Sequence, residues 1–357
     1  MKVNQLKLSN FRNYSCETVN FKNGLNFLVG KNAQGKTNLL ESLYLISVGK
    51  SPKTSKDKQL IMFNKDSASI NVNFETVGGN KNILMYLNNN KKSIKINNLN
   101  ILKLTELVGT LSVVYFSPDE LKLIKEVPED RRNFLDISIS QFDKPYLYNL
   151  IRYEKVLKQR NAILKTVDSS ESKIEQLKLF TPQLIDTATK IIKKRLEFIE
   201  KINLIAKNIH KNITLNEELN LNYSYNFSKD NILKDLTTQF ENSINKDIEL
   251  GYTTVGPHRD DIIFTINGLD CKFYASQGQQ RTVALSVKLA LMEIIKQEIG
   301  EYPILLLDDV LSELDEDRQT RLLTSLKGNQ TLITCTEIPK INCEFNTIKI
   351  NSGKIEK

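Results

Sequence analysis

The segment from Gly30 to Thr37 fits the phosphate-loop pattern, in which two glycines frame four other residues and are followed by lysine and a hydroxyl residue. Its glycines let backbone N–H groups close around phosphate oxygens. In this pattern Lys36 is predicted to bridge the β- and γ-phosphates of ATP, and Thr37 to bind Mg²⁺. A glycine-rich turn matching by chance is the alternative. The predicted nucleotide contacts in this loop are Gly30, Lys31, Asn32, Ala33, Gln34, Gly35, Lys36 and Thr37.

A second chemical element lies far downstream, where the apolar run 304–307 ends in Asp308 and Asp309. A buried strand that delivers carboxylates at its C-terminal end is typical of ligand sites in open α/β sheets. Asp308 is predicted to hold Mg²⁺ through its coordination shell. Asp309 is predicted to be catalytic, with Lys36, by orienting or deprotonating the attacking water. The alternative is that one or both acids only cap the following turn.

A third element, Ser276-Gln277-Gly278-Gln279-Gln280-Arg281, precedes a predicted helix and lies shortly before the carboxylate strand. It resembles the L-S-G-G-Q signature of ABC ATPases at Ser276, Gly278 and Gln279. That resemblance implies that the serine and the helix N-terminus contact the γ-phosphate held by a second subunit. A small hydroxyl residue and a glycine at the positive end of a helix suit an anion. The alternative is an ordinary helix N-cap.

These elements must be positioned by a mixed α/β architecture. Strand-like alternation dominates the first third of the chain, including 25–29, 69–74, 83–87 and 93–96. Apolar residues at helical spacing in 145–165 and 182–212 predict a helical middle third. Strands 262–266, 304–307 and 330–334 then alternate with helices 281–299 and 316–326, which predicts a parallel sheet covered on both faces.

The long separation between Lys36 and Asp308 indicates that something is inserted into the nucleotide-binding fold. We therefore expect an α/β, ABC-type P-loop ATPase head with an inserted, mainly helical second lobe and no long coiled coil. The expected division is 1–118 for the N-terminal part of the ATPase lobe, 119–248 for the helical lobe, and 249–357 for the part that carries the signature and the two aspartates.

The composition favours a polyanionic partner without requiring one. Lysine and arginine number 50 against 42 aspartates and glutamates, which gives a formal net charge of +8. Such a balance suits phosphate backbones, although a coding bias toward lysine and asparagine produces the same excess. No stretch approaches the roughly 20 apolar residues that span a membrane, and the first residues alternate rather than form a signal core. The chain is therefore expected to be cytoplasmic.

Further motifs resemble those of the RecF family of bacterial recombination-repair proteins. They are residues 10–14, 30–37, 116–119, 254–260, 276–281 and 307–315. The resemblance implies an SMC-like, ATP-dependent homodimer that binds DNA, both double-stranded and at gapped or single-stranded junctions, and hydrolyses ATP slowly to release it. It also implies work with the RecO and RecR mediators in loading recombinase, and roles in replication restart and the SOS response.

The chain departs from the wider ABC pattern in two ways that predict slow turnover. No histidine follows the last core strand, where Thr334 or Thr336 stands instead. The usual catalytic glutamate is the shorter Asp309. Asp119 or Glu120 is expected where the family usually has a glutamine.

Two further polar segments leave alternatives open. Arg12 is predicted to reach a nucleotide phosphate, as N-terminal arginines of SMC-like heads do, or else to be a surface arginine in a hairpin. The run 258–261 forms either an ion-pair network or a contact with nucleotide or DNA.

Two other functions fit parts of the pattern. An ABC transport ATPase would serve a membrane permease, but such subunits usually keep the switch histidine and lack a large helical insertion. A nucleotide kinase or other phosphotransferase would use the phosphate loop alone and would leave residues 276–281 without a role.

Overall fold

The computed structural model describes residues 1–89, 91–166, 169–214, 216–228, 231–313, 315–326, 328–340 and 344–356. The chain forms two compact units. The first comprises Met1–Glu120, Asn212–Leu215 and Leu285–Lys357, and the second comprises Leu121–Lys211 and Asn216–Ala284. Both units are built from segments that are separated in the sequence.

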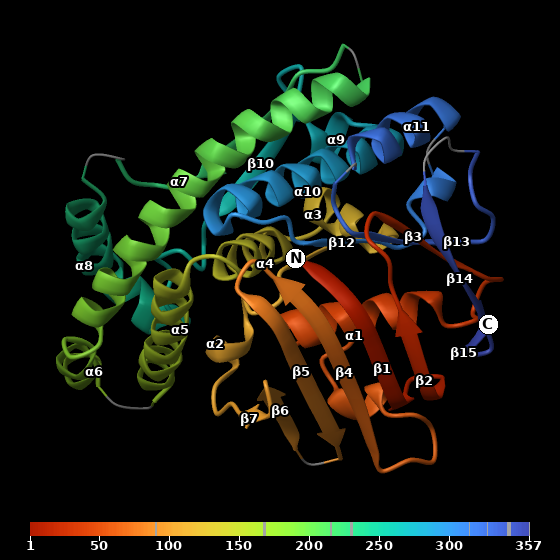
Figure 1. Cartoon of the computed structure of the whole chain (residues 1–357). Helices are drawn as coiled ribbons and strands as arrows, with labels where there is room; N and C mark the ends of the chain where they lie inside the picture. The colour runs from red at the N-terminus through yellow and green to blue at the C-terminus, as the bar shows by residue number, and fades with distance from the viewer. Residues whose placement is uncertain are drawn as a thin grey trace. The chain divides into compact units, whose positions relative to one another are not determined.

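The first unit contains two six-stranded sheets (Figure 1). One is antiparallel, in the order β2-β1-β4-β5-β6-β7. Its strands are β1 (Lys2–Phe11), β2 (Tyr14–Asn20), β4 (Ser67–Thr76), β5 (Gly79–Asn88), β6 (Lys92–Ile96) and β7 (Leu99–Asn100). Side chains on β4 alternate between buried and more accessible positions, as expected for a sheet with one face on the core.

The second sheet has the order β15-β14-β3-β13-β12-β8 and is parallel except for the pair β14 and β15. Its strands are β3 (Leu25–Val29), β8 (Val113–Phe116), β12 (Ile304–Leu307), β13 (Thr331–Cys335), β14 (Phe345–Asn351) and β15 (Lys354–Glu356). Strands β8, β12 and β13 are buried along their whole length, which is why they read as continuous apolar runs. The parallel sheet predicted from the sequence is confirmed.

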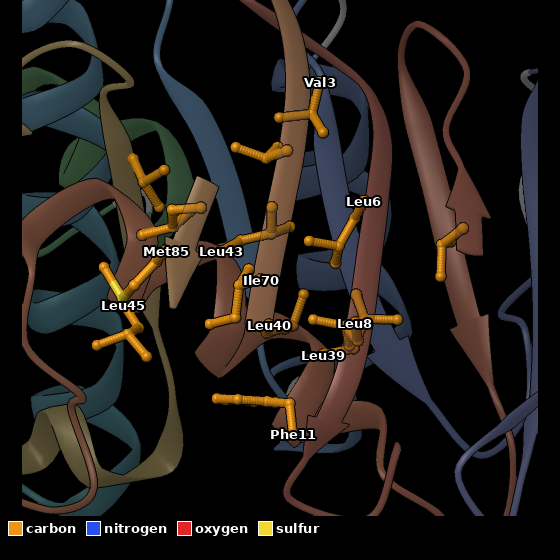
Figure 2. Close-up of a cluster of buried hydrophobic side chains, with 14 of the residues drawn as sticks. Val3, Leu6, Leu8, Phe11, Leu39, Leu40, Leu43, Leu45, Ile70 and Met85 are labelled. Atoms are coloured by element: carbon orange, nitrogen blue, oxygen red, sulfur yellow. The ribbon is translucent and has the colours of Figure 1, made fainter. Parts of the chain in front are cut away.

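Helix α1 (Lys36–Val48) contributes to a hydrophobic core that also receives side chains from both sheets of the first unit. Figure 2 shows Leu39, Leu40 and Leu43 of α1 beside Leu6 and Leu8 of β1. Leu28, Leu306 and Leu332 of the parallel sheet belong to the same cluster. The core therefore holds the start of α1, which directly follows the phosphate loop.

The remaining helices of the first unit are short, apart from α10 (Gln277–Ile299), whose N-terminal end belongs to the second unit. They are η1 (Asp57–Leu60), α2 (Leu104–Leu107), η2 (Pro118–Leu121), η4 (Leu311–Glu313) and α11 (Glu316–Ser325). The predicted helices 281–299 and 316–326 correspond to α10 and α11. Within the part of the chain that is described, no helix is both long and apolar enough to cross a membrane.

The second unit is mainly helical and contains most of α7, a helix of 34 residues whose last three belong to the first unit. Its helices are α3 (Lys122–Lys125), α4 (Pro128–Ser140), α5 (Lys144–Leu164), α6 (Ser170–Leu177), α7 (Thr181–Thr214), α8 (Ile232–Leu250) and α9 (Cys271–Tyr274). The predicted helices 145–165 and 182–212 match α5 and α7.

A three-stranded antiparallel sheet in this unit was not predicted. It joins β9 (Leu219–Ser224), β10 (Asp261–Ile266) and β11 (Leu269–Asp270). Because β10 pairs with β9 along its whole length, the segment up to Ala284 packs with the helical region. The expected C-terminal segment, 249–357, is thus divided between the two units at Ala284 and Leu285.

Buried charges are paired in the interior of the second unit. Arg160 is fully buried and donates to Asp247 and to the hydroxyl of Thr253, each at 2.7 Å. Arg195 donates to Asp136 at 2.7 Å and to the carbonyl oxygen of Pro257 at 2.6 Å. Such pairs are needed because an unpaired buried charge is costly.

The run 258–261, for which two interpretations were open, adjoins these pairs: Asp260 is buried, His258 and Asp261 are half-buried, and Arg259 is exposed. His258 contacts the Tyr153 hydroxyl through Nδ1 at 2.6 Å and the Thr253 carbonyl oxygen through Nε2 at 3.0 Å. Burial lowers the pKa of His258 to about 4, so the imidazole is neutral at pH 7. A carbonyl oxygen only accepts, so Nε2 carries the proton. The observed geometry is that of a hydrogen-bond and ion-pair network.

Replacing Arg160 with methionine is expected to lower the free energy of unfolding by about 3–5 kcal/mol, because it leaves Asp247 buried without its cation. Chemical denaturation followed by circular dichroism measures the change. Lys190→Met is the control, because Lys190 pairs with Asp186 at the surface, where a pair contributes about 1 kcal/mol or less. Equal losses in the two variants would show that the Arg160 pair is not needed for stability.

Candidate nucleotide-binding site

The phosphate loop connects β3 to α1 and depends on glycine at both ends. A Cβ on Gly30 would lie 2.3 Å from the carbonyl oxygen of Ile350, which leaves no room for a side chain. Gly35 has φ +113°, and a Cβ there would lie 2.6 Å from Asn13 Nδ2. A residue other than glycine would therefore displace the loop at either position.

Lys36 is buried inside this loop. Its ammonium donates to the carbonyl oxygens of Gly30 at 2.6 Å and of Lys31 at 3.0 Å. The ammonium group therefore lies beside the loop backbone, which is expected to surround the phosphates. Lys31, Asn32 and Ala33 are exposed, and Gln34 is half-buried.

Asp308 meets the phosphate loop directly. Its Oδ1 accepts hydrogen bonds from the Thr37 hydroxyl at 2.8 Å and the Thr334 hydroxyl at 2.9 Å. Its Oδ2 accepts from the Tyr115 hydroxyl at 2.9 Å. Since β8 and β13 flank β12, their C-terminal ends deliver Tyr115 and Thr334 to the carboxylate. The two residues predicted to share a metal, Thr37 and Asp308, are thus brought together.

Asp309 stands beside this cluster in a left-handed backbone conformation, φ 51°. Its backbone N–H donates to the Thr334 hydroxyl at 2.8 Å. Partial burial, followed by the negative charge of Asp308, raises the pKa of the Asp309 carboxyl, while Lys36 opposes that rise. The carboxylate is therefore a stronger base than an exposed aspartate.

Sequence reasoning missed Tyr115 and left two candidates for the position of the switch histidine. Tyr115 lies inside an apolar run, but its hydroxyl, one residue before the end of β8, was a usable signal. Thr334 is buried against both aspartates, whereas the side chain of Thr336 is exposed. Glu120 pairs with Lys288 at 2.9 Å; the side chain of Asp119 lies outside the described residues.

Arg12 makes an ion pair with α1. Its guanidinium donates to both carboxylate oxygens of Glu41, at 2.9 and 2.7 Å, and to the carbonyl oxygen of Gln59 at 2.8 Å. Glu41 is fully buried, so the pair fixes the β1–β2 turn to the helix behind the phosphate loop. The neighbouring Asn13 contacts the loop itself, because its Nδ2 donates to the carbonyl oxygen of Gln34 at 3.0 Å. Asn13 was not predicted.

The signature-like residues belong to the second unit. Ser276 is exposed and caps α10 in a reciprocal pair of bonds. Its Oγ accepts from the Gln279 backbone N–H at 3.2 Å, and Gln279 Oε1 accepts from the Ser276 N–H at 2.8 Å. A Cβ added to Gly278 would meet no atom closer than 4.0 Å. The N-terminus of α10 is therefore capped and open to approach by a ligand.

Comparison with known proteins agrees with this geometry. Residues 2–351 match the RecF/RecN/SMC N terminal domain. The "DNA replication and repair protein RecF" of Clostridium acetobutylicum is 43% identical over 99% of both chains. The protein of the same name from Clostridium kluyveri is 48% identical over the full length of both.

Solved structures give the same result. The "recombination mediator protein RecF-ATP in RecFOR pathway" superposes with a TM-score of 0.91 at 34% identity, covering 99% of this chain and 97% of that one. An Smc head bound to the C-winged helix domain of ScpA gives a TM-score of 0.58 at 15% identity, covering 100% and 96%, and shares the fold alone. The chain therefore belongs to the RecF family of the RecF/RecN/SMC proteins.

Proposed function

We propose that this protein is an ATP-dependent DNA-binding protein of recombinational repair and replication restart. In this proposal ATP binding closes a homodimer on DNA, and slow hydrolysis releases it. The observation that carries the proposal is the hydrogen bond at 2.8 Å between Thr37 of the phosphate loop and Asp308, which follows β12, because it brings together the two residues expected to hold Mg²⁺.

The described side chains fit a nucleotide with its magnesium ion. Thr37 and Asp308 supply hard oxygen donors of the kind that Mg²⁺ prefers, and they lie within hydrogen-bond distance of each other. Magnesium, when bound there, neutralises charge on the phosphates. Lys36 would exchange its bonds to the loop carbonyls for phosphate oxygens, while the backbone N–H groups of the loop hold the β-phosphate.

Asp309 is the proposed catalytic carboxylate, which orients or deprotonates the attacking water. Its position next to Asp308 and its raised pKa both suit a general base. Thr334 holds the Asp309 backbone but has no titration near neutral pH, so it cannot shuttle a proton as a histidine would. Slow turnover follows from this arrangement.

The capped N-terminus of α10 is the proposed contact to the γ-phosphate of a second copy. Ser276 and Gly278 are exposed there, and Gln279 holds the turn. The positive end of a long helix stabilises an anion. Each nucleotide would then join two chains, so that dimerisation depends on ATP.

The proposed partners are DNA, RecO and RecR. The net charge of +8 suits contacts to a phosphate backbone. The full-length similarity to proteins named for DNA replication and repair, and for the RecFOR pathway, favours this role over that of a transport ATPase.

Lys36→Ala is expected to weaken ATP binding by at least about tenfold, because it removes the cation that meets the β- and γ-phosphates. Isothermal titration with ATP and Mg²⁺ measures the affinity. Lys22→Ala is the matched control, because Lys22 is an exposed lysine of the same unit that lies outside the phosphate loop. The assignment is wrong if both variants bind ATP as the wild type does.

Asp309→Asn is expected to retain ATP binding and to slow hydrolysis about 10²–10⁴-fold, the usual range for a general base. In the wild type the ionised carboxylate is the active form. Because its pKa is raised, activity is expected to fall on acidification at a pH above the ordinary range for aspartate. A single-turnover pH profile tests this, and an unchanged acidic limb in Asp309→Asn would contradict it.

Ser276→Arg is expected to bind ATP normally but to stay monomeric, because a large cation at the capped turn blocks the second copy. Light scattering with and without ATP measures the molar mass. The molar mass of the wild-type protein should double when ATP is added in the presence of DNA. If the wild type binds ATP and its mass never changes, Ser276 is only a helix cap.

A further inference from the structure

The turn between β14 and β15 lies against the phosphate loop in the first unit. Strand β14 runs parallel to β3 with Lys349 opposite Val29, so both strands end at the same edge of the sheet. The phosphate loop follows β3 there, and Ser352 and Gly353 follow β14. The two segments are separated by more than 300 positions in the sequence.

Gln34, in the middle of the phosphate loop, receives three hydrogen bonds from this turn. The backbone N–H of Gly353 donates to the Gln34 carbonyl oxygen at 2.9 Å. The Ser352 backbone N–H and hydroxyl donate to Gln34 Oε1 at 2.5 and 3.1 Å. Both the backbone and the side chain of one loop residue are thus held from the same turn.

Asn13, on a third segment, lies against both Gln34 and Gly353. Its Nδ2 donates to the same Gln34 carbonyl oxygen at 3.0 Å, and its own carbonyl oxygen lies against Gly353. A Cβ on Gly353 would lie 2.2 Å from that oxygen, and Gly353 has φ +72°. Only glycine fits between Asn13 and Gln34 without moving one of them.

We propose that Ser352 and Gly353 are positioning residues of the nucleotide site, which fix Gln34 and thereby aim the backbone N–H groups of residues 34–36 at the β-phosphate. This inference rests on the proposed function. Ala33 and Gly35, on either side of Gln34, have φ +65° and +113°, a conformation that needs support from neighbouring segments. The turn supplies that support through Gln34.

Affinity for ADP tests the proposal, because ADP carries the β-phosphate and needs no dimer or hydrolysis. Gly353→Ala is expected to weaken binding of ADP and of ATP by the same factor, about tenfold, since a small displacement of phosphate donors has large effects. Gln34→Leu, which keeps the backbone bond but removes Oε1, is expected to weaken both by about fivefold. The double variant should bind no more weakly than Gly353→Ala, because both changes disturb the same turn against Gln34 and their effects should not add.

Gly79→Ala is the matched control. Gly79 also has a positive φ, +99°, in a β-hairpin of the same unit, but a Cβ there would meet nothing within 4 Å. It should lower the melting temperature as Gly353→Ala does without changing the dissociation constant for ADP. If Gly353→Ala does not fold, Gln34→Leu decides.

The outcomes separate the two proposals. If the wild type binds ADP, and Gln34→Leu and Gly353→Ala bind it as tightly as Gly79→Ala, the role of the turn is overturned while the nucleotide site stands. If the wild type binds neither ADP nor ATP, the proposed function itself fails, and the role of the turn fails with it.

Discussion

The hydrogen bond between Thr37 and Asp308 joins two segments that lie 271 positions apart in the sequence. It places the first turn of α1 against the end of β12, at the edge where the parallel strands finish. Tyr115 and Thr334 complete the hydrogen bonding of the same buried carboxylate. Because a buried charge is tolerated only when it is well paired, the strand order β3-β13-β12-β8 and the polar residues at its edge depend on one another.

Local patterns predicted the parts of the fold that local chemistry determines. The ABC-type α/β fold is confirmed, and β12 ends at Leu307, where the apolar run predicted that it would. The phosphate loop was recognisable because glycine, lysine and threonine must be close in sequence to act together. The roles assigned to Lys36, Asp309 and Ser276 stay predictions.

Contacts between distant segments were not predictable from one sequence. Glu41 gave no sign that it would pair with Arg12, because its partner is in a separate hairpin. Strand β9 pairs with β10 although helix α8 separates the two strands in the sequence, and both strands belong to the second unit. The role of Asn13 depends on the close approach of three separate segments.

The segment 254–260 is a motif whose residues make hydrogen bonds within the second unit. It is one of the segments that resemble the RecF family, yet His258 is neutral, half-buried and bonded to the Tyr153 hydroxyl. Burial raises the pKa of Asp260 to about 6, and Tyr223 donates to its carboxylate at 2.5 Å. The carbonyl oxygen of Pro257 accepts from Arg195. These contacts join the segment before β10 to α5, α7 and β9 of the second unit.

The order of strands in the parallel sheet has a consequence for synthesis on the ribosome. β3 lies between β13 and β14, and both neighbours are translated long after it. Until they emerge, the nascent chain displays β3 with both of its edges unpaired, a state that invites aggregation. The phosphate loop contacts residues in and after these late strands, so it would reach its final conformation last. A product terminated before these strands would therefore lack the proposed nucleotide site.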